Sequence, residues 1–340
     1  MPATLKVNDN STIHFGDAAR LLTRLLDGRR ALAVTDSEVQ RCLPQLFGTA
    51  EPLTVGRGEE SKTLATVAEL YRRFMACGAD RTSFIIGIGG GIVTDIAGFA
   101  AATYMRGVEF GFVPTTLLAQ VDASVGGKNG VNVDGYKNMV GTFAQPRFVI
   151  CDVSLLRTLP DREFRAGLAE ALKAGIIADP ELFALLERND FATLRRDESL
   201  LEEVVYRALK VKADIVARDE RESGDRRLLN LGHTLAHAIE KCCPSQLNHG
   251  EAVAVGTILA SRAAVHLGML AESECRRVET ALAGLGFSSE VPASMPELLS
   301  AVARDKKSSG DSVWLVLPES IGQCTSRLTP RKELSEIFDR

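Results

Sequence analysis

The stretch SFIIGIGGGIVTD, from Ser83 to Asp95, decides the fold class. Its first half, SFIIGI, is short and almost continuously apolar, which is typical of a strand in a sheet that is buried on both faces. The glycines that follow open a helical pattern, and a strand that leads through a turn into a helix is the unit of a parallel α/β layer. Glycines also let the backbone approach a pyrophosphate at a helix N-terminus, so the stretch favours a nucleotide site. Its spacing departs from G-x-G-x-x-G, which leaves a plain tight turn as the alternative.

Segments on either side of this stretch repeat the alternation of strands and helices. Further β-type runs are RALAVT from Arg30, FGFV from Phe110 and FVICD from Phe148. Helical patterns lie between these runs, over Asp17–Leu26, Ser37–Leu46 and Leu64–Cys77. The alternation predicts an α/β domain with a parallel sheet over residues 1–153.

After about Ser154 the spacing of apolar residues becomes helical. The expected helices cover Arg162–Ile177, Glu181–Glu187, Leu200–Ala217, Asn230–Lys241, Glu251–Leu270 and Glu272–Leu285. Only Val313–Leu317 is expected to form a strand in this half. These patterns predict a mostly α-helical domain over residues 154–340.

Composition places the chain among ordinary globular proteins. Of its 340 residues, 45% are apolar and 25% are charged, and the net charge of −4 gives no general attraction to nucleic acid or anionic lipid. Seven scattered cysteines without a C-x-x-C motif favour a reduced, cytoplasmic protein. Arg262 and His266 interrupt the apolar stretch Ala252–Leu270, so we interpret it as a buried helix rather than a membrane span. We therefore expect neither nucleic acid nor a membrane as a partner.

A long glycine-rich segment, VPTTLLAQVDASVGGKNGVN, follows the FGFV run. Thr115 and Thr116 supply hydroxyl groups, and Asp122 is a carboxylate among them. Lys128 is a cation beside two glycines, and the Lys137–Asn138 pair that follows adds a second lysine. A long polar loop inside a compact domain is usually functional, and this one suits a phosphate or carboxylate ligand. The alternative is a solvated loop without a ligand.

A set of histidines and one glutamate has the composition of a metal site. His233 and His237 are spaced i and i+4, so they share one helix face, while His249 follows a short link and Glu170 belongs to an earlier helix. Imidazole and carboxylate together favour Zn²⁺ or a similar divalent ion. Spacing alone does not decide between the pair His233–His237 and the pair His233–His249, and each histidine has an ordinary core position as its alternative.

Several single residues carry weaker signals. Asp36 follows the first strand, where a carboxylate can accept hydrogen bonds from a ribose, but an N-cap is the simpler interpretation. Glu59 and Lys62 have a surface ion pair as their alternative. The helical half also contains a cationic set that consists of Lys173, Lys212, Arg226 and Lys306–Lys307. Most lysines are simply solvated, but Lys173 is three residues from Glu170 and projects from the same helix face.

Taken together and in order, these motifs resemble the 3-dehydroquinate synthase branch of the sugar-phosphate cyclase family. The resemblance rests on GGGIVTDIAGFAAATYMRGVEF, VPTTLLAQVDASVGGKNGVN, YKNMVGTFAQP, GLAEALKAGII, DERESGDRRLLNLGHTLAHAIE and HGEAV. It extends from about Val34 to Leu317, and several long motifs in order are far more specific than one glycine turn. The link Cys242–Asn248 departs from the Gly- and aromatic-containing link that is more usual before His249.

The resemblance implies a dehydroquinate synthase-like fold, with a Rossmann-like α/β domain that binds NAD and a helical domain that binds metal and substrate. It also implies tightly bound NAD, Zn²⁺ or Co²⁺, an anionic sugar phosphate as substrate, and a homodimer. The family's reaction converts 3-deoxy-D-arabino-heptulosonate 7-phosphate to 3-dehydroquinate and phosphate, on the shikimate pathway to aromatic amino acids. This phosphate-eliminating lyase reaction proceeds by transient NAD oxidation, phosphate β-elimination, re-reduction and an intramolecular aldol step.

The family pattern also assigns roles residue by residue. Its metal ligands correspond to Glu170, His233 and His249, which leaves His237 as a substrate-side group. Its NAD contacts correspond to Asp36, Glu59, Lys62, Gly90, Gly91, Asp95, Thr115, Thr116 and Lys137. Its substrate contacts correspond to Arg106, Asp122, Lys128, Asn138, Lys173, Lys212, Arg226, Asn230, His237 and Lys306, which we prefer to Lys307.

Three other functions are alternatives to the one that the resemblance implies. Another sugar-phosphate cyclase, with an inosose or valiolone-type product, would not need the extra cations that a substrate carboxylate requires. A metal-dependent polyol dehydrogenase would release NADH, whereas a cyclase returns the hydride. A non-catalytic nucleotide-binding module would have no need of a metal ion.

Overall fold

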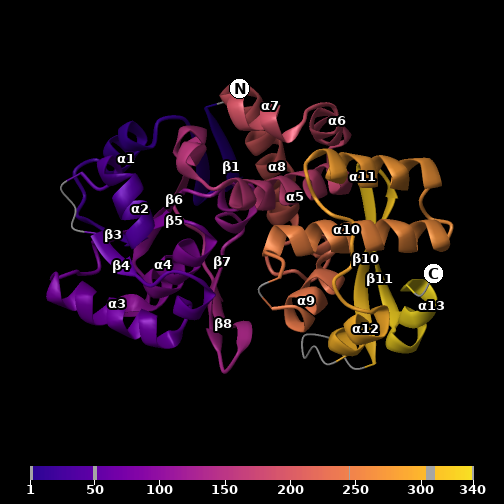
Figure 1. The fold of residues 1–340 in the computed structure, drawn as a ribbon. Coiled ribbons are helices and arrows are strands. Elements are labelled where there is room, and N and C mark those ends of the chain that lie inside the picture. Colours follow the sequence, from indigo (N-terminus) through magenta and orange to yellow (C-terminus); the bar gives the residue numbers. More distant parts are fainter. Residues whose placement is uncertain (1–2, 49–51, 245, 304–310, 339–340) are drawn as a thin grey trace. The chain divides into compact units, whose positions relative to one another are not determined.

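The computed structural model describes residues 3–48, 52–244, 246–303 and 311–338 (Figure 1). The chain divides into two compact units, Met1–Phe164 and Arg165–Arg340. The first is built on a mainly parallel sheet and the second is mostly helical, so the predicted fold class is confirmed.

A seven-stranded sheet forms the centre of the first unit, in the order β1-β2-β9-β6-β5-β3-β4. Its strands are β1 (Thr4–Asn8), β2 (Ser11–Phe15), β3 (Ala31–Asp36), β4 (Pro52–Val55), β5 (Phe84–Gly89), β6 (Glu109–Pro114) and β9 (Phe148–Cys151). Only β1 and β2 pair antiparallel within this sheet; the remaining neighbours pair in parallel. The predicted strand SFIIGI is β5, at the middle of the parallel part.

Both faces of the sheet are covered, which explains why β5 is apolar throughout. Phe84 and Ile86 pack with Leu22 of α1 (Ala18–Leu26) on one face. On the other face α4 (Gly91–Thr103) lies against β5 and β6, and α3 (Leu64–Ala76) packs beside α4. Because successive side chains of a strand point to opposite faces, a strand between two helical layers needs apolar residues at every position.

Helices dominate the second unit, and α10 is at its centre. The helices are α5 (Asp161–Ala178, which starts in the first unit), α6 (Pro180–Arg188), α7 (Phe191–Arg196), α8 (Glu198–Arg218), α9 (His233–Cys242), α10 (His249–His266), α11 (Glu272–Gly284), α12 (Met295–Ala303) and α13 (Leu334–Phe338). α9, α11 and the strand β10 (Ser312–Ser320) all pack on α10, which is buried from Ala252 to Ser261. α10 corresponds to the apolar stretch that we interpreted as a buried helix. Among the described residues, no helix combines the length and apolar character needed to cross a membrane.

Several expectations for the secondary structure were wrong. The glycine-rich segment is not one long loop, because β7 (Lys128–Val133) and β8 (Tyr136–Phe143) form an antiparallel hairpin. Its two-residue turn, Asp134–Gly135, has φ values of 50° and 78°, and an Asp-Gly turn of this kind is a strong hairpin signal. The second unit has another strand, β11 (Gln323–Pro330), which pairs with β10 but lacks an apolar run.

The remaining differences concern edges and ends of elements. The strands β1, β2 and β4 were not expected; β1 and β4 are the two edges of the sheet, where the apolar pattern is weakest. The expected helix Ser37–Leu46 ends at Cys42 as α2 (Ser37–Cys42), and Pro44 then begins a 3₁₀ turn. Proline disfavours the helical conformation of the preceding residue, which accounts for the break at Leu43.

Candidate functional site

Three helices of the second unit bring one glutamate and two histidines together. Glu170 projects from α5, while His233 and His249 are the first residues of α9 and α10. One ligand atom from each side chain lies within 4.8 Å of the others. Within the part of the chain that the structure describes, the cluster contains His249 rather than His237, whose ring lies edge-on to His233 with centroids 5.5 Å apart.

Both imidazole rings turn the same nitrogen toward the glutamate. Nε2 of His233 is 3.6 Å and Nε2 of His249 is 3.4 Å from Oε1 of Glu170. The other nitrogen of each ring has its own partner, since Nδ1 of His233 lies 3.1 Å from the carbonyl oxygen of Leu231 and Nδ1 of His249 lies 3.4 Å from Oε1 of Glu240. An N–H at Nδ1 leaves the lone pair of Nε2 available for a metal.

The glutamate carries its charge in a buried position. Glu170 is only 2% exposed, and neither of its carboxylate oxygens accepts a hydrogen bond from the described residues, although the Lys173 ammonium forms an ion pair with Oε2. Burial raises the pKa of Glu170, but the Lys173 ammonium and the neighbouring His249 outweigh this effect and hold the pKa well below its usual range. The carboxylate is therefore ionised, which is the form that binds a cation.

The two histidines differ in protonation. Burial and the Lys173 ammonium lower the pKa of His233 to about 3, so this ring is neutral. Burial also lowers the pKa of His249, but the Glu170 and Glu240 carboxylates outweigh it and raise that pKa to about 9. Since a metal ligand must be deprotonated, cation binding would release a proton from His249 at neutral pH.

Close helix packing explains why these side chains meet. Gly250 follows His249, and a Cβ atom at Gly250 would lie 2.3 Å from the Cα atom of Ala166, one turn before Glu170 on α5. A Cβ atom at Gly256 would lie 2.1 Å from the carbonyl oxygen of Gly232, the N-cap of α9. Glycine at these two positions thus allows α10 to approach both α5 and α9.

The donor set fits a divalent cation of the zinc type. Two imidazole nitrogens and one carboxylate oxygen match the three protein ligands of many catalytic zinc sites, in which a further position stays open for water or substrate. The buried Glu170 oxygens, which lack hydrogen bonds from the described residues, are what such a cation would satisfy.

The cationic residues predicted for the second unit are mostly buried. Lys173 and Lys212 are 3% and 8% exposed, and Arg226 is 3% exposed on the 3₁₀ helix Asp225–Asn230. Nη1 of Arg226 donates to the carbonyl of Glu220, and Asn230 donates to Glu222. Buried cations are rare unless they have a partner or a function. Lys306, the last predicted residue of this set, lies outside the described residues.

In the first unit, predicted residues from distant parts of the sequence form one polar network. Nζ of Lys62 forms an ion pair with Asp95 and lies 2.6 Å from Oδ1 of Asn138. Glu59 joins through Asn132, whose side chain accepts from the backbone N–H of Asn138 and donates to Glu59. Lys62 is 4% exposed, so the alternative of a surface pair with Glu59 was wrong. Asn132 was missed, because nothing in its local sequence marks it.

The glycine turn is next to the predicted threonines. Gly90 is the N-cap of α4 and, as a glycine, makes no side-chain cap to the first turn of the helix. The backbone N–H of Thr115 donates to the carbonyl of Gly89, and a Cβ at Gly90 would lie 3.1 Å from Cγ2 of Thr116. Oδ1 of Asp36 accepts hydrogen bonds from the backbone N–H groups of Glu38 and Val39. Asp36 therefore caps α2, as its simpler interpretation predicts.

The remaining predicted residues of this unit lie on connecting turns and on the hairpin. Arg106 is exposed in a 3₁₀ turn with a positive φ of 70°, and Asp122 belongs to the π-helical turn Ala119–Ala123. Lys128 begins β7 and Lys137 lies on β8, and both are exposed.

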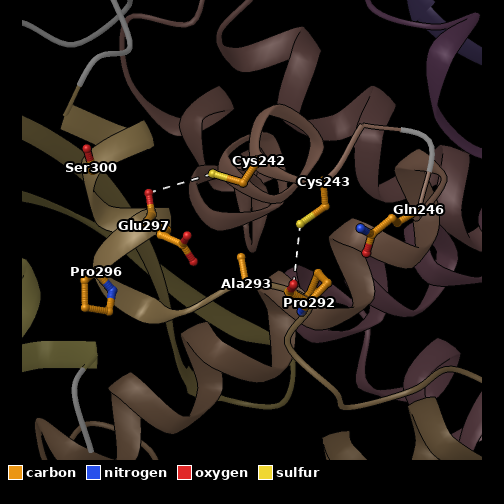
Figure 2. Close-up of a pocket in the computed structure, with 8 residues that line it drawn as sticks. All are labelled: Cys242, Cys243, Gln246, Pro292, Ala293, Pro296, Glu297 and Ser300. Atoms are coloured by element: carbon orange, nitrogen blue, oxygen red, sulfur yellow. Dashed lines mark hydrogen bonds between the residues drawn. The ribbon is translucent and has the colours of Figure 1, made fainter.

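A separate cavity of the second unit contains none of the predicted residues (Figure 2). Its lining comes from the end of α9, the following link and the region of α12, and consists of Cys242, Cys243, Gln246, Pro292, Ala293, Pro296, Glu297 and Ser300. The thiols point to different carbonyls, with Cys242 Sγ 3.8 Å from Glu297 O and Cys243 Sγ 3.6 Å from Pro292 O. All seven cysteines are free.

Comparison with known proteins agrees with the resemblance. Residues 52–166 match the family model "3-dehydroquinate synthase N-terminal", and residues 167–308 match "3-dehydroquinate synthase C-terminal". The chain belongs to the 3-dehydroquinate synthase family. The enzyme of that name from Geobacter metallireducens is 45% identical over 83% of this chain and 78% of its own length, and the one from Nitrosospira multiformis is 43% identical over 96% and 93%.

Solved structures of other sugar-phosphate cyclases resemble this member of the 3-dehydroquinate synthase family in fold. One is a 2-deoxy-scyllo-inosose synthase complexed with carbaglucose-6-phosphate, NAD⁺ and Co²⁺, with a TM-score of 0.88, 26% identity and 98% coverage of each chain. Another is the 2-epi-5-epi-valiolone synthase of Streptomyces hygroscopicus with NAD⁺ and Zn²⁺, with a TM-score of 0.86, 30% identity, and 99% and 97% coverage. A probable glycerol dehydrogenase, at 19% identity and a TM-score of 0.55, shares the fold alone.

Proposed function

We propose that this chain catalyses the reaction of its family, the conversion of 3-deoxy-D-arabino-heptulosonate 7-phosphate to 3-dehydroquinate and phosphate. The observation that carries the proposal is the Glu170–His233–His249 cluster in a chain 43–45% identical to enzymes named for this reaction. The rival cyclases are less similar in sequence, at 26–30% identity, and the dehydrogenase alternative rests on fold alone.

Glu170, His233 and His249 are assigned to a divalent cation, Zn²⁺ or Co²⁺. When bound, the cation acts as a Lewis acid and NAD accepts and returns a hydride. Glu170 supplies an ionised carboxylate oxygen, and the two histidines supply Nε2 atoms that already face it. His237 neighbours His233 on the same helix and is our candidate for moving a proton at a substrate hydroxyl.

The NAD contacts are assigned to the first unit and the metal to the second. The uncapped start of α4 at Gly90 and Gly91 suits the pyrophosphate, and Asp36 suits a ribose. Lys62, Asp95, Glu59, Thr115, Thr116 and Lys137 complete this set. The proposed division is an NAD-binding domain over residues 1–153 and a metal- and substrate-binding domain over residues 154–340.

The cations and polar groups are assigned to the substrate's phosphate and carboxylate. Lys128, Lys173, Arg226 and Asn138 are the principal contacts, and each charge-assisted contact is worth about 1.5–3 kcal/mol. The supporting contacts are assigned to Arg106, Asp122, Lys212, Asn230 and Lys306. A cytoplasmic location fits the seven free cysteines, and a homodimer is proposed from the family resemblance.

A stoichiometric assay tests the function. Purified protein loaded with zinc and NAD should release phosphate and form 3-dehydroquinate in a one-to-one ratio, without net NADH. A steady NADH signal would support a dehydrogenase instead. Turnover of a seven-carbon sugar phosphate that lacks the carboxylate, without turnover of the heptulosonate, would support another cyclase.

A further inference from the structure

We infer that Glu240 is a positioning residue of the metal centre, whose carboxylate holds the Nδ1–H group of His249 and so presents Nε2 of that ring to the cation. The inference rests on the proposed function, because it presupposes a divalent cation at Glu170, His233 and His249. No sequence motif predicts a role for Glu240.

The contacts place the His249 ring between two carboxylates. Oε1 of Glu170 lies 3.4 Å from Nε2, and Oε1 of Glu240 lies 3.4 Å from Nδ1 on the other side of the ring. The Glu240 side chain is only 14% exposed. A carboxylate behind a ligating histidine fixes its tautomer and orientation and increases its basicity toward the metal.

Helix α9 bears both His233, which is one of the proposed ligands, and Glu240, which contacts the ligand His249. Glu240 follows His233 by seven residues on α9, which is close to two helical turns, so the two side chains share one face of the helix. Because α9 is a continuous helix from His233 to Cys242, the spacing between ligand and orienting group is set by helix geometry.

The end of α9 that bears Glu240 is anchored. Directly after Glu240 and Lys241, the thiols of Cys242 and Cys243 contact carbonyl oxygens of Glu297 and Pro292 at the α12 side of the cavity (Figure 2). These contacts oppose fraying of the last turn, where a helix would otherwise open most easily. The helix turn that bears Glu240 therefore has tertiary contacts with the α12 region.

The two histidines differ in a way that makes the inference testable. Nδ1 of His233 is held by the backbone carbonyl of Leu231, which no substitution removes, whereas Nδ1 of His249 is held by a side chain. Replacing Glu240 should therefore weaken one ligand and leave the support of the other intact.

The experiment compares Glu240→Gln and Glu240→Ala with the wild-type chain. Zinc Kd is measured by competition with a chromophoric chelator, and the visible absorption spectrum is recorded for Co²⁺-loaded protein. Glu240→Ala should weaken zinc binding by about 10–100-fold and alter the cobalt spectrum. Glu240→Gln should lie between Glu240→Ala and wild type, because its amide oxygen still accepts from Nδ1–H but carries no charge.

Glu279→Gln is the matched control. Glu279 is also a half-buried carboxylate of the second unit, but its partner is Arg262. Arg262 follows His249 by 13 residues on α10, which is about 20 Å along the helix. This control should keep the wild-type zinc Kd.

The outcomes separate this inference from the proposed function. If wild-type protein binds zinc but both Glu240 variants keep its Kd and cobalt spectrum, or lose only thermal stability, the positioning role is refuted and the function stands. If Glu240→Ala does not fold, Glu240→Gln decides by the same two measurements. If wild-type protein takes up no zinc, the metal centre itself is wrong and the inference fails with it.

Discussion

The two sets of candidate residues are built in different ways. In the second unit, Glu170, His233 and His249 project from three packed helices, and their meeting depends on glycines that allow backbone atoms to come close. In the first unit, the corresponding residues lie on connecting turns, in the first turns of α2 and α4 and on the β7–β8 hairpin, and several are exposed. A disturbance of helix packing should therefore affect all three metal ligands together, whereas loss of an exposed hairpin lysine should affect only the contact that this side chain makes.

Removal of a ligand should have the largest effect. His249→Ala takes away one of three ligands, so we expect loss of bound zinc and of turnover, a larger effect than the roughly 100-fold upper end for a group that only orients a ligand. The metal content after gel filtration measures the loss of zinc, and the rate of phosphate release measures the loss of turnover. His266→Ala, at the other end of α10, is the control and should keep both properties. Wild-type zinc content in His249→Ala would remove His249 from the ligand set.

A side chain inserted between α10 and α5 should have the second largest effect. Gly250→Ala places a Cβ atom 2.3 Å from the Cα of Ala166, so the helices must move apart. We expect a loss of about 1–3 kcal/mol in unfolding free energy, as for overpacking elsewhere, together with weaker zinc binding. Chemical denaturation and zinc competition give the two values.

Gly284→Ala is the matched control for that change. Gly284 is also a helical glycine of the second unit, but a Cβ there meets nothing within 4 Å. It should raise stability by about 0.5–1 kcal/mol, because alanine favours the helix. Equal behaviour of the two variants would contradict the role of close packing at Gly250.

A hairpin residue should give a more isolated effect. Lys128→Ala should lower kcat/KM by about 10–150-fold, as expected for one lost charge-assisted contact, with stability and zinc content unchanged. Lys210→Ala removes an exposed lysine that pairs with Asp214 on α8 and serves as the control. An unchanged kcat/KM for Lys128→Ala would refute its contact with substrate, and a loss of bound zinc would erase the contrast between the two units.

The smallest effect concerns the turn before Arg226. Slight burial raises the pKa of Asp219, but backbone N–H groups of Ser223, Gly224 and Arg226 outweigh it and lower the pKa below its usual 3.8. The carboxylate therefore contributes stability above about pH 4, and this contribution is lost as pH falls through the lowered pKa. Asp219→Asn should cost less than about 1 kcal/mol at pH 7, because the group is largely solvated. Denaturation from pH 7 to pH 3 should show the difference shrinking; a constant difference would contradict the account.

Local patterns predicted the layers of the fold but not its less apolar elements. β5 is apolar at every position because both sheet faces are covered, so its sequence reveals it. β11, with the sequence QCTSRLTP, is stabilised by pairing with β10 and shows no such pattern. The β7–β8 hairpin could be predicted from Asp134–Gly135, which is a typical turn pair of a two-residue hairpin. The lysines and glycines around this pair are also typical of a ligand-binding loop, which is the structure that we predicted.

The site depended on contacts that spacing cannot supply. Spacing did not decide whether His237 or His249 joins His233, and the choice follows from how α10 packs against α5 and α9. The ion pair between Lys62 and Asp95 joins residues 33 positions apart and needs the folded sheet. Glu240 contacts a histidine across the link that follows α9, so no helical periodicity on one element predicts the pair.

Anomalous diffraction at the zinc edge tests the central claim most directly. Crystals grown with zinc and NAD should show one strong peak about 2.0–2.2 Å from Nε2 of His233, Nε2 of His249 and a carboxylate oxygen of Glu170. A peak on the thiols of Cys242 and Cys243, or on any group other than these three, would contradict the account.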